Sequence, residues 1–241
     1  MKAASSRVAL GFDDGAVERR IGLVALATDL TLESDAAAVT GTNKVGVFTT
    51  RIAYDNPVTA ATLRAMGPRI AAASRLILPG ERLDAIAFGC TAAAAEIGDD
   101  AVAAALREGR PGLPTATPTS GLLAACHTLG VRRLAVLAPY TEAVSRDLAA
   151  YLEQRGVGVT ALTWLGVDDD RKIAKIRPDV VAAAALEAMR PDADALFCSC
   201  TALRAAQLSP DLERRLGVPV LTSNQVLLWQ ALRAAGSDIA F

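Results

Sequence analysis

The sequence predicts an α/β fold built from two similar lobes, and three observations lead to this prediction. Short apolar runs alternate with longer alanine-rich segments along all 241 residues. Such alternation is typical of parallel strands joined by helices that cover both faces of a sheet. Apolar residues make up 52% of the chain but aromatic residues only 4%, which fits a core of Ala, Val and Leu. Finally, LDAIAFGCTAAAAEI (83–97) and ADALFCSCTALRAAQL (193–208) repeat one plan: an apolar strand, Cys-Thr, then an alanine-rich helix.

The elements follow from this alternation. Strands are expected at 21–28, 44–50, 83–91, 132–140, 157–166, 194–201 and 218–224. Helices are expected at 57–74, 92–108, 119–130, 142–155, 179–190, 202–216 and 224–235. Three of these helices stop before Gly130, Gly156 and Gly217. Glycine at such a position adopts the left-handed conformation that ends a helix.

The two halves are expected to form separate lobes. The Pro-, Gly- and Thr-rich segment 107–120 fits the crossing between them, and a second crossing follows Val220. We expect residues 1–116 with 223–241 to form one lobe and residues 117–222 the other. Each lobe is expected to have three layers, α/β/α, around a parallel four-stranded sheet. A pseudo-twofold axis would relate the lobes and place the active site in the cleft between them.

Composition excludes several classes of protein. With 25 basic and 26 acidic residues and no basic patch, nucleic acid is not an expected partner. No apolar run reaches about 18 residues and the N-terminus is too polar for a signal peptide, so we expect a cytoplasmic protein without membrane contact. The four cysteines do not form a secreted disulfide framework, and the one histidine, His127, gives no zinc-ligand spacing. We expect no metal and no cofactor.

Cys90 and Cys200 are the candidate catalytic residues. Both are expected where a strand ends and a helix begins, where backbone N–H groups and the helix dipole lower the pKa of a thiol. Two such groups facing each other suit inversion of a carbon beside a carboxylate, since one removes a proton and the other returns one. The alternative is that both are small buried hydrophobes. We interpret Cys198 and Cys126 as core residues, and the run 168–170 (Asp-Asp-Asp) as a solvated turn that opens a helix.

These motifs resemble the aspartate/glutamate racemase superfamily. GCT (89–91) and SCT (199–201) in two similar halves carry the resemblance. The more detailed resemblance is to the branch of maleate cis–trans isomerases, arylmalonate decarboxylases and ectoine-utilisation EutA-type proteins. The EutA-type proteins are the most similar. Four further segments are similar to motifs of that branch, in the same order: RIGLVALATDLTLE (20–33), KVGVFTTRIAYDNPVTAATL (44–63), LAPYTEAVSRDLAAYLEQRGV (137–157) and LGVPVLTSNQVLLWQALRAAG (216–236).

The resemblance implies roles for individual residues. Cys90 and Cys200 match the two catalytic cysteines, and Tyr140 matches a tyrosine that contacts a substrate carboxylate. Thr91 and Thr201 fall where the family binds carboxylate oxygens. Asn224 lies in the C-terminal signature, either at the substrate or bracing the cleft. Arylmalonate decarboxylases keep only the second cysteine, which argues against that activity here.

Asp29 and Arg51 are two further candidates for substrate binding. Asp29 stands where maleate isomerases carry an asparagine that binds a substrate carboxylate, and an anion suits an ammonium group better. The alternative is that Asp29 caps the following segment. Arg51 follows a strand, where it is expected either to bind a carboxylate or to pair with Asp55.

Three functions stay open at this point. The first is a cofactor-independent racemase or epimerase that uses both cysteines on an amino-acid-like carboxylate. The second is a maleate-type cis–trans isomerase, in which one thiolate adds to a double bond. The third is a non-catalytic ligand-binding protein on the same fold, with a decarboxylase as a further alternative. Apolar helices in this family lead us to expect a homodimer.

Overall fold

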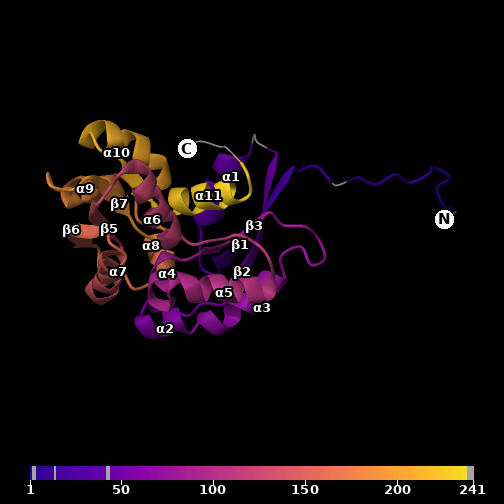
Figure 1. Ribbon diagram of the computed structural model, residues 1–241, viewed down its shortest axis with the longest axis horizontal. Coiled ribbons are helices and arrows are strands. Elements are labelled where there is room, and N and C mark those ends of the chain that lie inside the picture. The colour runs from indigo at the N-terminus through magenta and orange to yellow at the C-terminus, as the bar shows by residue number, and fades with distance from the viewer. Residues whose placement is uncertain (2–3, 14, 42–43, 238–241) are drawn as a thin grey trace.

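The computed structural model describes residue 1 and residues 4–13, 15–41 and 44–237. Within this part the strands form two parallel four-stranded sheets, with helices packed around both (Figure 1). The predicted α/β fold is therefore confirmed. No helix among the described residues is long and apolar enough to cross a membrane.

The first sheet has the strand order β2-β1-β3-β4. Its strands are β1 (Arg19–Leu26), β2 (Val45–Ile52), β3 (Ala85–Gly89) and β4 (Thr115–Ala116). The two central strands are apolar on both faces because helices cover the sheet on both sides. The two-residue β4 was not expected, since it lies within the Pro-, Gly- and Thr-rich crossing and has no apolar run.

The second sheet repeats this order as β6-β5-β7-β8. Its strands are β5 (Arg133–Ala138), β6 (Gly158–Trp164), β7 (Ala195–Cys198) and β8 (Val220–Thr222). Each strand of the first sheet thus has a counterpart in the second, β1 with β5 and β3 with β7. The second of these pairs lies in the segments 83–97 and 193–208, in which the sequence repeats itself.

Helices connect the strands as expected, with differences in their limits. The longer ones are α1 (Leu32–Thr40), α3 (Gly67–Arg75), α5 (Asp99–Gly109), α6 (Pro118–Leu129), α7 (Glu142–Gln154), α9 (Pro178–Ala188), α10 (Ser209–Leu216) and α11 (Ser223–Ala234). The shorter ones are α2 (Ala60–Arg64), α4 (Thr91–Ile97), α8 (Asp170–Ile173) and a 3₁₀ turn over Ala206–Leu208. Gly130, Gly156 and Gly217 have φ of +71°, +84° and +70°, which confirms their role as helix ends.

Several expected helix limits are wrong. The single helix expected over 92–108 is broken at Gly98, whose φ of +91° interrupts the helical backbone between α4 and α5. The helix expected over 57–74 is likewise two helices, α2 and α3. Helix α1 was not expected at all. The helix expected from 202 begins only at Ser209, because turns follow Cys200.

The last helix, α11, returns to the first sheet. It packs against β3, β4 and α1, and it lies beside α1 in Figure 1. Its contact with α6 is close: a Cβ on Gly121 would lie 2.4 Å from the backbone oxygen of Val226. The lobe limits 1–116 with 223–241 and 117–222 remain a prediction, and residues 238–241 lie outside the described part of the chain.

Candidate active site

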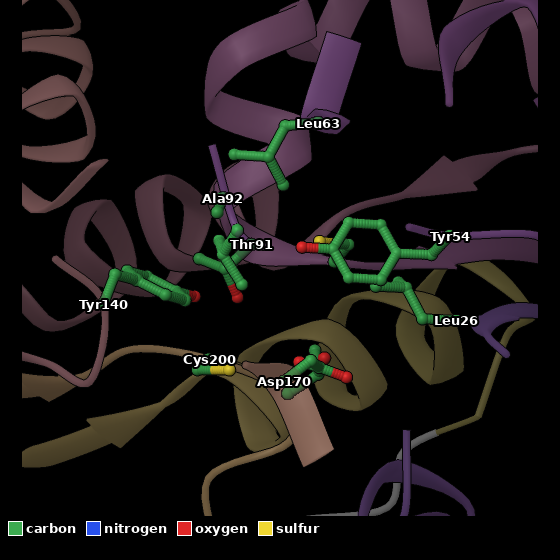
Figure 2. A pocket seen from close by; sticks show the side chains of 11 residues that line it. Leu26, Tyr54, Leu63, Thr91, Ala92, Tyr140, Asp170 and Cys200 are labelled. Atoms are coloured by element: carbon green, nitrogen blue, oxygen red, sulfur yellow. The ribbon is translucent and has the colours of Figure 1, made fainter. Parts of the chain in front are cut away.

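A small cavity lies where the carboxyl ends of six strands converge. It is lined by residues that follow or end strands of both sheets, together with side chains of α2 and α4. The lining residues are Leu26, Tyr54, Val58, Leu63, Cys90, Thr91, Ala92, Tyr140, Asp170, Cys200 and Thr201. Parallel sheets bind ligands at this edge. Figure 2 shows Tyr54 and Tyr140 reaching in from opposite sides, with Cys200 and Asp170 beneath.

Five of the eight sequence-predicted residues therefore meet in one place: Cys90, Thr91, Tyr140, Cys200 and Thr201. The space inside it is about 10 Å³, about enough for one water molecule. A substrate with several heavy atoms needs more room, so the walls of this cavity must separate before one can enter.

Cys90 sits at the N-cap of α4, directly after β3, as the sequence predicted. Its environment differs from the prediction, because burial raises the pKa of the Cys90 thiol to about 12. The N–H groups of Ala93 and Ala92 at the start of α4 act in the opposite direction, but desolvation outweighs them. The expectation of a lowered thiol pKa is thus wrong for this closed cavity, where Cys90 is a neutral thiol.

Cys200 differs from Cys90 in its backbone. Its φ is +92°, a conformation that side chains other than glycine rarely adopt, and turns rather than a helix follow it. The N–H of Cys200 donates to Ser223 Oγ at 2.9 Å. The hydroxyl of Tyr140 lies 3.4 Å from Ser199 Oγ, and its proximity to Cys200 acts to lower the pKa of that thiol. Burial nevertheless raises the pKa of the Cys200 thiol well above its ordinary value. Cys200 therefore lacks the helix N-terminus that the sequence predicted for it.

The two cysteine–threonine turns are tied together across the sheets. Thr91 Oγ1 donates to Ser223 Oγ at 2.8 Å, and that same oxygen accepts the N–H of Cys200. Thr201 Oγ1 donates to the backbone oxygen of Gly89, the last residue of β3, at 3.2 Å. The hydroxyls of both threonines are thus committed as donors inside the protein, and they fix the two cysteines relative to each other.

Asp170 is the functional candidate that sequence reasoning missed. The Asp-Asp-Asp run does open a helix, α8, but Asp170 is buried and lines the cavity, so reading the whole run as a solvated turn is wrong. Thr28 Oγ1 donates to its carboxylate at 2.6 Å. Burial raises the pKa of Asp170 to about 6 despite that hydrogen bond. Its neighbour Asp169, paired with Arg171 at 2.8 Å, has its pKa lowered to about 2.

Tyr54 was also missed, although its segment resembles a family motif. It follows β2, just as Tyr140 follows β5. The Tyr54 hydroxyl is buried and has no hydrogen-bond partner among the described residues. Burial raises the pKa of Tyr54 and of Tyr140, so both phenols stay protonated and are available as donors. A position just after a strand, at the carboxyl edge of the sheet, was the signal in the sequence that pointed to Tyr54.

Three predicted residues do not line the cavity. Asp29 Oδ1 accepts the N–H groups of Thr31 and Leu32 at 2.7 and 2.9 Å, which is the capping arrangement considered as the alternative. Arg51 pairs with Glu33 and donates to the backbone oxygen of Asp29 at 2.8 Å. The alternative of a pair with Asp55 is wrong, because Asp55 lies 3.6 Å from Arg69 instead.

Asn224, the third of these, braces the turn behind Cys200. Its Nδ2 donates to the backbone oxygen of Thr201 at 2.9 Å and to Asp35 Oδ2 at 2.6 Å. Cys198 and Cys126 are fully buried and absent from the lining, as expected for core residues.

Comparison with known proteins identifies the family. The model of the family described as "Arylmalonate decarboxylase" matches residues 93–241, more than half of the chain. The chain belongs to this family. The arylmalonate decarboxylase of Bordetella bronchiseptica is 34% identical over 138 residues, which span 56% of this chain and 57% of that enzyme. Maleate isomerase of Nocardia farcinica is 25% identical over 235 residues, 92% of each chain.

Solved structures agree with this family assignment. A mutant of arylmalonate decarboxylase in its liganded form superposes with a TM-score of 0.82 at 26% identity, covering 91% of this chain and 94% of that one. The predicted resemblance to the maleate isomerase and arylmalonate decarboxylase branch of the aspartate/glutamate racemase superfamily is confirmed. The family match starts at residue 93, so it includes Cys200 and leaves out Cys90.

Proposed function

We propose that this protein is a cofactor-independent isomerase, a racemase or epimerase that acts on a small carboxylate through Cys90 and Cys200. The observation that carries the proposal is the convergence of two thiols from equivalent strand ends, after β3 and β7, on one buried cavity. A single buried cysteine is usually a small hydrophobe, but two in matched positions at the ligand edge of both sheets serve no packing need.

The chemistry needs one thiolate and one thiol. The thiolate removes the proton from the carbon beside the carboxylate, and the electron pair left behind spreads onto the carboxylate oxygens. The opposite thiol then gives its proton to the other face of the carbon, so the two sulfurs exchange roles and the substrate is inverted. Neutral donors stabilise the developing charge, and we assign this role to the hydroxyls of Tyr140 and Tyr54.

An amino-acid-like substrate of the EutA type is part of this proposal. The family resemblance of the sequence favours it, as does aspartate at position 29 in place of asparagine. Because Asp29 caps α1 and does not line the cavity, its contribution to selectivity is less direct than a contact with substrate.

Maleate-type isomerisation is the second candidate, favoured by the likeness to the Nocardia maleate isomerase along 92% of both chains. There a thiolate adds to one alkene carbon, the bond to its neighbour rotates, and elimination restores the thiolate. A decarboxylase is less well supported, because that activity is associated with the second cysteine alone.

Proton NMR in heavy water separates these functions. The protein is incubated with aspartate, hydroxyaspartate, diaminobutyrate derivatives and maleate, beside the variants Cys90→Ser and Cys200→Ser. Racemisation replaces the α-proton by deuterium, and we expect either substitution to slow the exchange by about 10²–10⁴-fold. Cys198→Ser is the matched control, two residues before Cys200 but outside the cavity.

Other outcomes would point elsewhere. Conversion of maleate to fumarate without exchange at any amino acid would favour the nucleophilic mechanism. Binding without turnover, unaffected by either substitution, would mean a ligand-binding protein.

A further inference from the structure

The charge in the cavity lining is negative, with no positive side chain among the described lining residues to balance it. Among the described residues that line it, Asp170 carries the only full charge expected at neutral pH, and there is no Lys, Arg or His. The other polar groups are two phenols, two thiols and two threonine hydroxyls, all neutral. A substrate that is only an anion would therefore meet a buried carboxylate with no cation to offset it.

Asp170 is held firmly in this position by the first lobe. Thr28 Oγ1 donates to its Oδ2 at 2.6 Å, and its own N–H donates to Asn56 Oδ1 at 3.0 Å. Within the described part of the chain, no donor reaches the other carboxylate oxygen, Oδ1. This oxygen is not among the buried atoms that lack a partner, so it is accessible and can accept a hydrogen bond from a ligand in the cavity.

We infer that Asp170 is the specificity residue of the site and that its carboxylate receives the protonated amine of an amino-acid substrate. The inference rests on the proposed function and names the substrate class for it. A substrate ammonium offers three N–H donors and a positive charge, which together satisfy the free oxygen and neutralise the buried anion. The substrate carboxylate then lies toward the phenols of Tyr54 and Tyr140, between the two thiols.

This arrangement also links binding to activation of the thiols. Besides burial, the negative charge of Asp170 raises the pKa of both Cys90 and Cys200. An ammonium group on Asp170 cancels that charge, so one thiol releases its proton to bulk water more readily once substrate is bound. The titratable groups that act on Asp170 or are acted on by it are Cys90, Cys200, Tyr54, Asp29 and Asp169.

Matched pairs of ligands test the inference without any need for turnover. We would measure the Kd of L-aspartate against succinate, L-glutamate against glutarate, and L-alanine against propionate, each pair differing only in the amine. In the wild type at least one amino acid should bind about tenfold or more tightly than its deaminated partner. Asp170→Asn should reduce that preference at least tenfold. Asp168→Asn, which removes an equal charge from an exposed neighbour, should leave it unchanged.

Alkylation of the empty protein gives a second, independent measurement. Cys90 and Cys200 are labelled with neutral iodoacetamide or anionic iodoacetate and quantified by mass spectrometry. Asp170→Asn should accelerate both reactions, and iodoacetate about tenfold more than iodoacetamide, because only the anion is repelled by the carboxylate. A merely loosened cavity would accelerate both reagents equally. Thr28→Val, which removes only the hydroxyl donor, should shift the binding preference several-fold in the same direction.

Failure of the inference and failure of the proposed function are distinguishable. An unchanged ligand preference in Asp170→Asn, or no preference for an amine in the wild type, overturns the inference even if both cysteines prove essential for isomerisation. If the wild type prefers ligands with an amine but exchanges no α-proton with solvent, the proposed function is wrong. Asp170 would then still be an ammonium-binding residue.

Discussion

At the scale of single residues, burial raises the pKa of the titratable side chains that line the cavity. Desolvation keeps Cys90, Cys200 and Tyr140 neutral, and it raises the pKa of Asp170 to about 6. The empty site is thus in a resting form with few charges. We expect catalysis to begin only when a bound substrate lowers the pKa of one cysteine thiol. A thiol with a pKa near 12 is almost never a thiolate at pH 7, and only the thiolate acts as a base.

The raised pKa of Asp170 makes stability depend on pH. Its folded-state pKa of about 6 lies above the ordinary 3.8, so the folded protein holds this proton more tightly than the unfolded chain. The favourable contribution is fully present below about pH 4 and is lost as the pH rises through 6. We expect wild type to lose about 2 kcal/mol relative to Asp170→Asn between pH 4 and pH 7.

Urea unfolding of both proteins across this range measures that difference. Taking the difference cancels the titration of other groups, among them Asp35, whose pKa is also raised by burial. A difference independent of pH would show that Asp170 is not buried in solution as it is here.

Tyr140 and Tyr151 make a matched pair for testing the role of a buried phenol. Tyr140 lines the cavity together with Cys200, whereas Tyr151 donates to Asp99 at 2.6 Å outside it. Tyr140→Phe should slow turnover about 10- to 100-fold, the worth of a hydrogen bond to a charged group. Tyr151→Phe should cost about 1–3 kcal/mol of stability and leave turnover unchanged. Equal turnover in the two variants would remove Tyr140 from the mechanism.

At the scale of elements, the contact between α6 and α11 holds the returning C-terminal helix in place. Any side chain at Gly121 meets backbone: a Cβ there would lie 2.4 Å from Val226 O. Gly121→Ala should therefore destabilise the fold by about 1–3 kcal/mol through overpacking. Gly67→Ala in α3 is the control, since the nearest atom would be 3.8 Å away. Thermal melting of both variants checks this, and an unchanged Tm for Gly121→Ala would mean that α11 can shift.

Sequence patterns predicted the elements whose signals are local. Cys90 and Cys200 were placed correctly at strand ends because an apolar run followed by Cys-Thr fixes where each strand stops. The helix after Cys200 was wrongly predicted: Cys200 has a positive φ, and its N–H donates to Ser223, 23 residues along the chain. Composition favoured a helix there, and tertiary structure overrode it.

At the scale of the whole molecule, what the sequence could not predict lies between the lobes. Three consecutive aspartates look polar and exposed, and Asp170 becomes buried only because Thr28 and Asn56 of the first lobe close over it. Tyr54 escaped notice for a similar reason, since its importance depends on facing a cavity that both lobes form. The repeat in the sequence predicted two lobes, but not which loops would meet across them.

The segments that follow β2 and β6 contact each other and cover the site. Asn56 Nδ2 donates to Asp169 Oδ1 at 3.1 Å, while its Oδ1 accepts the N–H of Asp170. Beside them, the N–H of Val58 donates to Asp168 O at 2.7 Å. The segment after β2 is thus fastened to the segment after β6 over a space that holds one water. Because a substrate cannot fit this space, we expect these two segments to part whenever one enters or leaves.

Asn56→Ala should shift the protein toward that open form. It removes two hydrogen bonds, together worth about 1–3 kcal/mol, and changes none of the residues that line the cavity. Iodoacetamide should then label Cys90 and Cys200 about tenfold faster than in wild type, as followed by mass spectrometry. Cys126 and Cys198 report on general unfolding within the same sample, because both are core residues outside the cavity. Faster labelling of all four cysteines would indicate loss of stability, whereas unchanged labelling of Cys90 and Cys200 would show that access to the thiols does not depend on this closure.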